Sequence, residues 1–320
     1  MKAENYTRED IEKLVAGPDL RAKQFAQVYK KKQANPGLSW GIPEIDKVVL
    51  PMRPGDMVSI IARPGHAKTA MLAWKTRQEA NRILSEGIEN AGVIVCSWET
   101  TNEEYVAYML SDEIATVDRI ARATVPYGDM VRRATENARL PIYFIGRSQF
   151  NAGFKTPRMT LDVVENAIEL LYEQYNVRPT LLVMDYLQII PVPGVTNKTE
   201  QVETTTPWVK QMAMTIMAPV LIAAQAGRQV DSYDIKIPHS DDCQHSSAIE
   251  QASDKLFGQW RPSITEEPGS DPIEVYPGKF VDPANKNLLI FKMLKQRDSD
   301  GVFTWALDFD MRSRSMGIFR

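Results

Sequence analysis

Cysteine is scarce in this chain of 320 residues, which contains only Cys96 and Cys243. The two are far apart in the sequence, and Cys96 lies within the apolar run AGVIVCSW. This spacing argues against the disulfide framework that stabilises small secreted domains. We therefore expect a reducing compartment, namely the cytoplasm.

Long hydrophobic runs and an excess of charge of one sign are missing as well. No stretch approaches the roughly 18 consecutive apolar residues that a membrane-spanning helix needs. The N-terminal MKAENYTREDIEKLV lacks the apolar core of a signal peptide, so we expect a protein that is neither secreted nor inserted in a membrane. The formal charge of -3 leaves no global basic field, and any contact with nucleic acid has to come from a local cluster or a channel.

Apolar strands alternating with helical periods are present from residue 36 onward. Strands that are apolar throughout and separated by helices are typical of a parallel sheet covered on both faces, so the sequence predicts an α/β fold. The predicted strands are MVSIIA, AGVIVCSW, PIYFIG, TLLVMDYLQII, APVLIAAQ and KLFGQW, and the predicted helices lie around 69–85, 102–115, 128–138, 160–176 and 202–217.

The two ends of the chain differ from this pattern. Residues 1–35 are too few and too charged to form a core, so we expect a helical arm, opened by a capping box of Thr7 and Asp10, before a main domain over 36–320. Near the C-terminus, NLLIFKMLKQ and VFTWALDFD flank RDSDG and predict an antiparallel hairpin added to the sheet edge. The Pro- and Gly-rich segment 262–287 predicts a surface excursion, and the tail MRSRSMGIFR predicts a solvated terminus.

Glycine is missing from two positions of a near match to a phosphate-binding loop. IIARPGHAKTAM follows the pattern G-x-x-x-x-G-K-[ST], with Ala62 and Ala67 in place of the glycines and Gly65 keeping the turn possible. Alanine tolerates a right-handed helical conformation, so we expect Ala67 to be the first helical residue. The alternative is an ordinary surface turn between a strand and a helix.

A nucleotide site at this loop would combine loop amides, a helix N-terminus and a cation. Lys68 would add positive charge, and the Thr69 hydroxyl would hold Mg2+. The loop residues that we expect around the phosphates of ATP are Arg63, Pro64, Gly65, His66 and Ala67.

Polar side chains also follow three other predicted strands. Asp185 follows LLVM and suits magnesium, and Glu99 follows VIVCSW and suits a base for hydrolysis on the neighbouring strand. Gln225 ends VLIAAQ and suits a sensor of the γ-phosphate. Taken singly, each could be a local cap, for example Glu99 before the helix near Asn102. Together they would meet at the carboxyl edge of one sheet, where such sheets bind ligands.

With these residues in place, the chain resembles the ATPase domain of the DnaB-like replicative helicases, a branch of the RecA-like fold, over residues 36–320. CSWET is similar to the family's Ser-Leu-Glu-Met motif, VMDYLQII to its Asp-Tyr-Leu-Gln motif and PVLIAAQAGRQVD to its Leu-Ser-Gln-Leu-Asn-Arg segment. SSAIEQASD resembles Gly-Ala-Ile-Glu-Gln-Asp-Ala-Asp, and FKMLKQRDSDG resembles the Lys-Gln-Arg-Asn-Gly hairpin. The family's N-terminal primase-interacting domain has no counterpart in the resemblance.

The resemblance implies an enzyme that hydrolyses ATP with Mg2+ in a homo-oligomeric ring, usually a hexamer. Glu99 would be the catalytic glutamate, and Lys295 and Arg297 would reach the γ-phosphate of the neighbouring subunit. Movement along single-stranded DNA from 5′ to 3′, duplex unwinding, and a loader or other replication proteins as partners are implied as well. An isolated Lys-x-Arg is more commonly a solvated pair beside a turn.

Two loops, 191–203 and 229–247, would line the DNA channel of such a ring. The second loop is acidic, with Asp231, Asp234, Asp241 and Asp242, and lacks the arginine that the family places there. The residues left for DNA contact are Lys198, Arg228, Lys236, Gln244 and His245.

Other interpretations remain open. The acidic second loop favours a RecA-like ring or filament ATPase that regulates assembly or partner binding without unwinding DNA. Ala62 and Ala67 would suit a degenerate homologue, although the other catalytic residues are complete. His239, Cys243 and His245 suggest a zinc site, but a fourth ligand and a recognisable spacing are missing, which favours a polar mobile loop.

Overall fold

We describe the chain from a computed structural model. The structure describes residues 7–319 except 13–14, 16, 35, 152, 154–155, 246, 277, 298–300 and 311–314, and the side chains of residues 10 and 31 also lie outside the description. The chain divides into two compact units, Met1–Leu38 and Ser39–Arg320. No helix within the described ranges is long and apolar enough to cross a membrane.

The described part of the first unit contains the helices α1 (Arg8–Glu12) and α2 (Pro18–Ala34). Pro18 and Asp19 suit the first turn of α2, because proline needs no amide partner there and an acid complements the helix dipole. The predicted capping box depends on Asp10, whose side chain lies outside the described residues. The large apolar side chains of α2 are exposed, namely Leu20, Phe25, Val28 and Tyr29.

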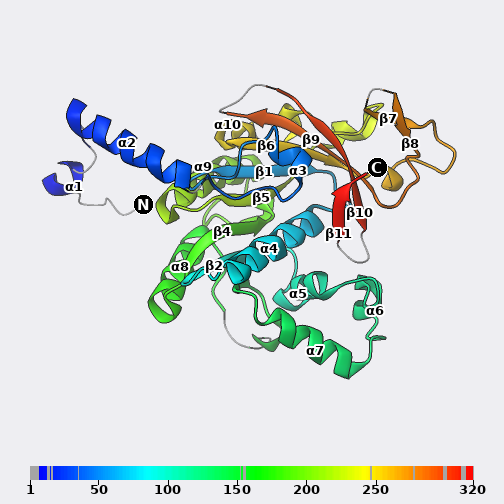
Figure 1. The fold of residues 1–320 in the computed structure, drawn as a ribbon, viewed down its shortest axis with the longest axis horizontal. Helices are drawn as coiled ribbons and strands as arrows, with labels where there is room; N and C mark the ends of the chain where they lie inside the picture. Colours follow the sequence, from blue (N-terminus) through cyan, green and yellow to red (C-terminus); the bar gives the residue numbers. More distant parts are fainter. Residues whose placement is uncertain are drawn as a thin grey trace. The chain divides into compact units, whose positions relative to one another are not determined.

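The second unit is built on a nine-stranded sheet with the order β11-β10-β9-β6-β1-β5-β4-β2-β3 (Figure 1). Strands from β6 to β3 run parallel, and β9, β10 and β11 are added antiparallel. The parallel strands are β1 (Met57–Ala62), β2 (Ala91–Ser97), β3 (Ile142–Gly146), β4 (Arg178–Asp185), β5 (Val220–Gln225) and β6 (Lys255–Trp260). The antiparallel strands are β9 (Leu288–Gln296), β10 (Thr304–Asp310) and β11 (Ser315–Ile318).

Helices cover both faces of this sheet, which is why its central strands are apolar throughout. The described helices of this unit are α3 (Pro43–Asp46), α4 (Lys68–Ser85), α5 (Asn102–Leu110), α6 (Val117–Ala121), α7 (Tyr127–Asn137), α8 (Leu161–Tyr175), α9 (Lys198–Ile216) and α10 (Ala248–Ala252). α4 and α9 contact its central strands, whereas α6 and α7 pack on α5.

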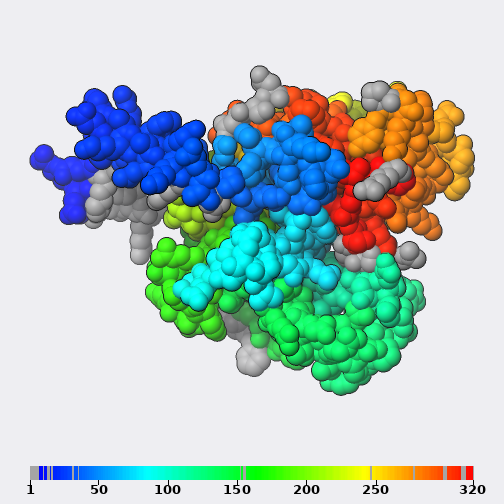
Figure 2. All heavy atoms as spheres, in the orientation of Figure 1, coloured from blue at the N-terminus to red at the C-terminus, as the bar shows by residue number. Residues whose placement is uncertain are grey.

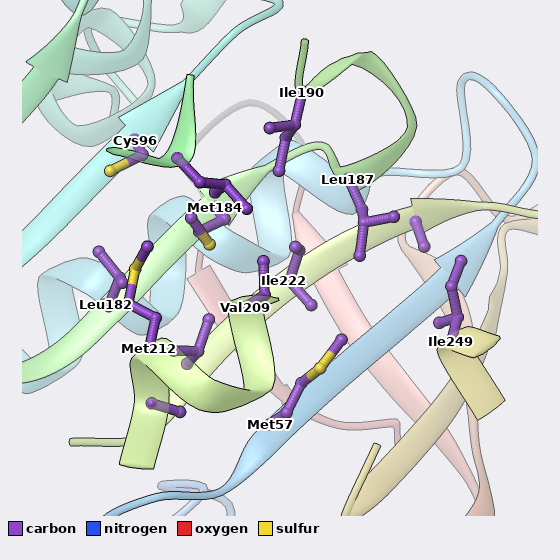
Figure 3. Close-up of a cluster of buried hydrophobic side chains, with 14 of the residues drawn as sticks. Met57, Cys96, Leu182, Met184, Leu187, Ile190, Val209, Met212, Ile222 and Ile249 are labelled. Carbon is purple, nitrogen blue, oxygen red and sulfur yellow. The ribbon is translucent and has the colours of Figure 1, made fainter. Parts of the chain in front are cut away.

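One continuous core joins the sheet to α8, α9 and α10. Met57, Leu182 and Ile222 from three strands pack against Val209 and Met212 of α9 (Figure 3). None of the described residues of α4 belongs to this core, although α4 contacts β1, β2, β4 and β5, so α4 covers the other face. In the space-filling view α4 lies between the segment 39–56 and the green helices α5 to α7 (Figure 2).

The structure corrects the prediction at two places and adds an element at a third. The helix expected over 102–115 ends at Leu110, because Asp112 Oδ1 accepts hydrogen bonds from the amides of Ile114 and Ala115 and forms a turn. The described part of the C-terminal tail is not a solvated terminus, because it forms β11, which pairs with β10. The outermost strand on this side of the sheet is therefore β11 and not a strand of the predicted hairpin. The surface excursion contains its own hairpin of β7 (Ile273–Tyr276) and β8 (Lys279–Val281).

Candidate active site

A cavity of about 220 Å³ lies at the carboxyl ends of the parallel strands. Lys68, Thr69, Glu99 and Gln225 line it together, although they come from three separate segments. Asp185, fully buried, lies directly behind Thr69. The other lining residues are Pro64, Gly65, Ala67, Ala70, Tyr108 and Tyr186.

The ammonium group of Lys68 points back into the segment 62–69 that matches a phosphate-binding loop, called the phosphate loop below. Its Nζ donates hydrogen bonds to the carbonyl oxygens of Ala62 at 3.0 Å and Arg63 at 3.1 Å. Burial lowers the pKa of Lys68 to about 8, although the carboxylates of Asp185 and Glu99 oppose the shift. A phosphate in the cavity would give this cation a charged partner in place of neutral carbonyls.

Ala67 adopts a left-handed backbone conformation, with φ 65° and ψ 25°. The prediction that it would be the first helical residue is wrong, because Ala67 is the N-cap and α4 begins at Lys68. This conformation costs a residue with a Cβ about 1–2 kcal/mol, since the Cβ approaches the following carbonyl oxygen. The loop therefore keeps, with alanine, the backbone shape that glycine adopts without strain.

Thr69 lines the cavity, and Asp185 lies directly behind it. Thr69 Oγ1 donates a 2.6 Å hydrogen bond to Asp185 Oδ2, whereas Asp185 Oδ1 is buried and has no hydrogen-bond partner in the described part of the chain. Burial raises the pKa of Asp185 to about 6, and the Glu99 carboxylate adds to the shift. A hydroxyl beside a carboxylate with an unused oxygen fits Mg2+, which prefers oxygen ligands and retains water.

Glu99 follows β2 and reaches the cavity by a different route from the one predicted. We expected its strand to neighbour the phosphate-loop strand, but β5 and β4 lie between β1 and β2. β2 instead neighbours β4, which ends at Asp185. Glu99 is not the cap of α5, because Thr101 forms a capping box there with Glu104.

Two tyrosines of the cavity were missed by the sequence reasoning. Tyr186 directly follows Asp185 within VMDYLQII, and burial together with the carboxylates of Glu99 and Asp185 raises its pKa. Its position directly after Asp185, a predicted magnesium ligand, could have indicated that it lies at the cavity. Tyr108 lies on α5, where helical periodicity alone does not reveal which residue meets the cavity.

The side chains of Arg63 and His66 do not line the cavity, so the predicted contact of these two residues with phosphates would have to come from their backbone amides. Arg63 forms a bidentate ion pair with Asp231, with both N–O distances 2.9 Å, and donates to the carbonyl of Ala226. The His66 Nδ1 accepts a 3.0 Å hydrogen bond from the amide of Arg261, and burial lowers the pKa of His66 to about 4. Both side chains brace the loop from outside.

Lys295 and Arg297 lie at the amino ends of the parallel strands, whereas the cavity lies at the carboxyl ends. β9 runs antiparallel to β6, so Gln296 at the end of β9 pairs with Lys255 at the start of β6. Arg297 forms a 3.0 Å ion pair with Asp254, and its side chain is 51% exposed. Lys295 donates to backbone carbonyls of α10. Neither cation is placed to serve the cavity of its own chain.

The first predicted DNA loop is shorter than expected. α9 begins at Lys198, because the Asn197 side chain accepts hydrogen bonds from the amides of Thr199 and Glu200 and caps the helix. The loop therefore ends at Asn197 and not at residue 203. Lys198 is exposed in the first turn, and its Nζ donates to Gln201 Oε1 at 3.3 Å.

The second predicted DNA loop is organised by its own acids. Asp242 is buried and accepts hydrogen bonds from Tyr233 Oη at 2.8 Å, Gln229 Nε2 at 3.0 Å and the His239 amide at 2.7 Å. Asp231 is engaged by the phosphate loop, as described above. Two carboxylates of the loop are thus used in internal contacts, so the acidity of the sequence overstates its free negative charge.

The predicted DNA-contacting residues of this loop differ in availability. Arg228 and His245 are exposed, and Gln244 is half-buried. Lys236 forms a 2.7 Å ion pair with Glu266, in which each side chain is 21% exposed. Lys236 is therefore neutralised within the chain.

His239, Cys243 and His245 do not converge as ligands. Within the described ranges, the group of potential metal ligands consists of His239, Asp241 and Asp242, whose ligand atoms lie within 4.8 Å of one another. Cys243 is buried, and burial raises the pKa of its thiol to about 12. A protonated thiol is a poor zinc ligand.

Comparison with solved structures confirms the predicted RecA-like fold. The chain is similar to a solved ATPase domain, with a TM-score of 0.73 and 18% identity over 93% of this chain and 98% of that chain. It is also similar to a DnaB-like replicative helicase whose structure was solved with its interactions with primase. There the TM-score is 0.72 at 18% identity, over 96% of this chain and 68% of the other.

Among curated proteins, the chain is similar in sequence to replicative DNA helicases DnaB. That of Mycoplasma genitalium is 26% identical over 228 residues, which are 69% of this chain and 46% of the relative. That of Rickettsia bellii is 26% identical over 248 residues, or 74% and 48%. The chain thus spans about half the length of these relatives. The model of the DnaB-like helicase C-terminal domain matches residues 37–308, and the chain belongs to that family.

Proposed function

We propose that this chain is a Mg2+-dependent ATPase of a homo-oligomeric ring, which is a hexamer in our proposal. ATP hydrolysis would drive it along single-stranded DNA from 5′ to 3′ and unwind the duplex. The observation that carries the proposal is the convergence of Lys68, Thr69, Glu99 and Gln225 on one cavity, with Asp185 behind them.

Each group of the cavity has a separate role in this proposal. Loop amides and Lys68 bind the phosphates, and Thr69 and Asp185 hold Mg2+, which neutralises charge on the phosphate oxygens when bound. Glu99 accepts the proton of the attacking water as a general base. Gln225 responds to the γ-phosphate.

Lys295 and Arg297 support a site that is shared between protomers. A head-to-tail interface joins two different surfaces of the same chain and closes into a ring when the rotation permits. Such an interface would bring the edge that carries Arg297 to the cavity of the next protomer, where the guanidinium stabilises charge on the γ-phosphate. A site completed in this way hydrolyses ATP only in the assembly.

DNA contact rests on the loops after β4 and β5. Lys198, Arg228, Gln244 and His245 supply the side chains, and loop amides add contacts to phosphates. Lys236 joins them only if it leaves Glu266. With so few free cations, the proposed grip on DNA is weak, and a loader or other replication proteins would support it as partners.

A second function is favoured by a specific observation. In the second loop, Lys236 is paired with Glu266, and the arginine that the family places there is absent. The loop therefore offers DNA neither of these two cations. These features suit a RecA-like ring or filament ATPase that regulates assembly or partner binding without unwinding DNA.

ATP turnover measured with and without single-stranded DNA separates these functions. Stimulation by DNA supports the helicase, and turnover that ignores DNA supports the regulator. A chain that binds DNA and ATP as an assembled ring yet shows no turnover contradicts both.

A further inference from the structure

Gln188 lies between the nucleotide cavity and both proposed DNA loops. It belongs to the short turn η2 (Leu187–Ile189), directly after β4, and is only 4% exposed. A buried glutamine requires partners for the two ends of its amide, because each end loses its hydrogen bonds to water. The identity of those partners shows what the residue holds together.

Both ends of the Gln188 amide bind the backbone of Gln225. The amide N–H of Gln225 donates to Gln188 Oε1 at 3.0 Å, and Gln188 Nε2 donates to the Gln225 carbonyl at 3.1 Å. The side chain of Gln225 lines the cavity. If nucleotide shifts the backbone of Gln225 together with its side chain, the shift either moves Gln188 or breaks two buried hydrogen bonds.

The same amide extends to the second loop. Gln188 Nε2 also lies 3.4 Å from the Gln244 carbonyl, and the Gln244 amide donates to the Gln225 carbonyl at 2.9 Å. Gln188, Gln225 and Gln244 thus form a closed set of hydrogen bonds. The second loop is attached to the cavity at this point.

A second buried glutamine continues the connection to the first loop. Gln201, which is 6% exposed, donates through Nε2 to the carbonyl of Gln188 at 3.2 Å and to that of Ile190. Gln201 Oε1 accepts from the Nζ of Lys198 at 3.3 Å. A continuous path of hydrogen bonds therefore joins Gln225 to Lys198.

We propose that Gln188 is a positioning residue that couples the nucleotide state at Gln225 to both loops, while Gln201 carries the coupling to the first loop only. The inference rests on the proposed function, which assigns DNA contact to these loops. An amide is required because the position needs a donor and an acceptor side by side. Methionine fills a similar volume but supplies neither in comparable strength.

Amide hydrogen exchange with and without a non-hydrolysable ATP analogue tests this assignment in the assembled protein. In the wild type, the analogue should slow exchange in segments 187–201 and 226–245. The measured quantity is the ratio of exchange rates without and with the analogue. In Gln188→Met this ratio should be lower than in the wild type by about tenfold or more in both segments, a size typical of lost coupling between sites. Affinity for the analogue should change far less, because Gln188 does not line the cavity.

Gln201→Met supplies a second test that does not depend on the folding of Gln188→Met. It should remove the response of segment 187–201 and leave that of 226–245 intact. Thr206→Val is the matched control on α9, because Thr206 is buried and its hydroxyl donates to the Val202 carbonyl within the same helix. This control should respond like the wild type.

The outcomes distinguish this inference from the proposed function. If Gln188→Met or Gln201→Met binds the analogue and keeps the wild-type response in both segments, the coupling role is overturned. If the variants lose the response but wild-type turnover ignores single-stranded DNA, the coupling role stands and the DNA function fails. A loss of response in Thr206→Val would show that any buried hydrogen bond matters, and would overturn the specific role of Gln188.

Discussion

Thr69 and Asp185 are 116 positions apart in the sequence, yet the threonine hydroxyl donates a 2.6 Å hydrogen bond to the carboxylate. The second carboxylate oxygen has no partner among the described residues. Without a cation, this buried acid is better accommodated in its protonated form, which is why its pKa rises to about 6.

The stability of the nucleotide-free chain should therefore fall as the pH rises from about 4 to about 6. In this range the folded state retains the Asp185 proton and the unfolded state does not, so the difference of about two pKa units corresponds to about 3 kcal/mol. Asp185→Asn should remove this part of the slope and be more stable than the wild type at pH 8 without Mg2+. Urea unfolding at several pH values measures both effects. An unchanged slope in Asp185→Asn would contradict the raised pKa.

Lys68→Ala should weaken ATP binding by about 10- to 100-fold, because a hydrogen bond between charged groups contributes about 1.5–3 kcal/mol. Titration with a fluorescent ATP analogue measures the change. Lys47→Ala, at an exposed position of the same unit, is the control and should bind as the wild type does. Equal affinity of the two variants would place the phosphates elsewhere.

Ala67→Gly should stabilise the folded chain by about 1 kcal/mol, because glycine adopts positive φ without the clash of a Cβ. Ala70→Gly, three residues later inside α4, should have the opposite sign and destabilise by about 1 kcal/mol. Chemical unfolding of the two variants gives the comparison. Destabilisation by both would mean that the left-handed conformation of Ala67 is not strained.

Glu266→Gln should strengthen binding to single-stranded DNA by freeing Lys236. One further phosphate contact steepens the dependence of log affinity on log salt by about 0.7 for a single strand. Fluorescence anisotropy at several salt concentrations measures the slope, and the exposed neighbour Glu267→Gln is the control. Identical slopes for the two variants would remove Lys236 from the DNA interface.

Much of the fold could be predicted, because the central strands are apolar on both faces and are recognisable as uninterrupted runs. β1 and β5 were predicted with nearly correct bounds for this reason. The order of the strands could not be predicted, since it depends on pairing between distant segments. β11 was missed because Ser315–Ile318 is short and its pairing with β10 is not visible in composition.

The candidate site could be predicted where a residue ends a strand, as Asp185 and Gln225 do. It could not be predicted where a side chain has a choice of partners. Arg63 and Asp231 are separated by 168 positions, and only the folded chain reveals that they pair. The conformation of Ala67 was misjudged because the requirement for positive φ lies in the loop geometry and not in the residue type.

Mixing two inactive variants tests the shared ATP site most directly. Arg297→Ala keeps an intact cavity but lacks the guanidinium that would reach the cavity of the next protomer, here called the finger. Glu99→Gln keeps the finger but lacks the general base in its own cavity. Each variant alone should bind ATP and hydrolyse it poorly. In rings mixed at equal amounts, about one quarter of head-to-tail interfaces should pair an intact cavity with an intact finger, so about a quarter of wild-type turnover should return. No recovery above the separate variants, with mixed rings demonstrated, would contradict a site shared between protomers.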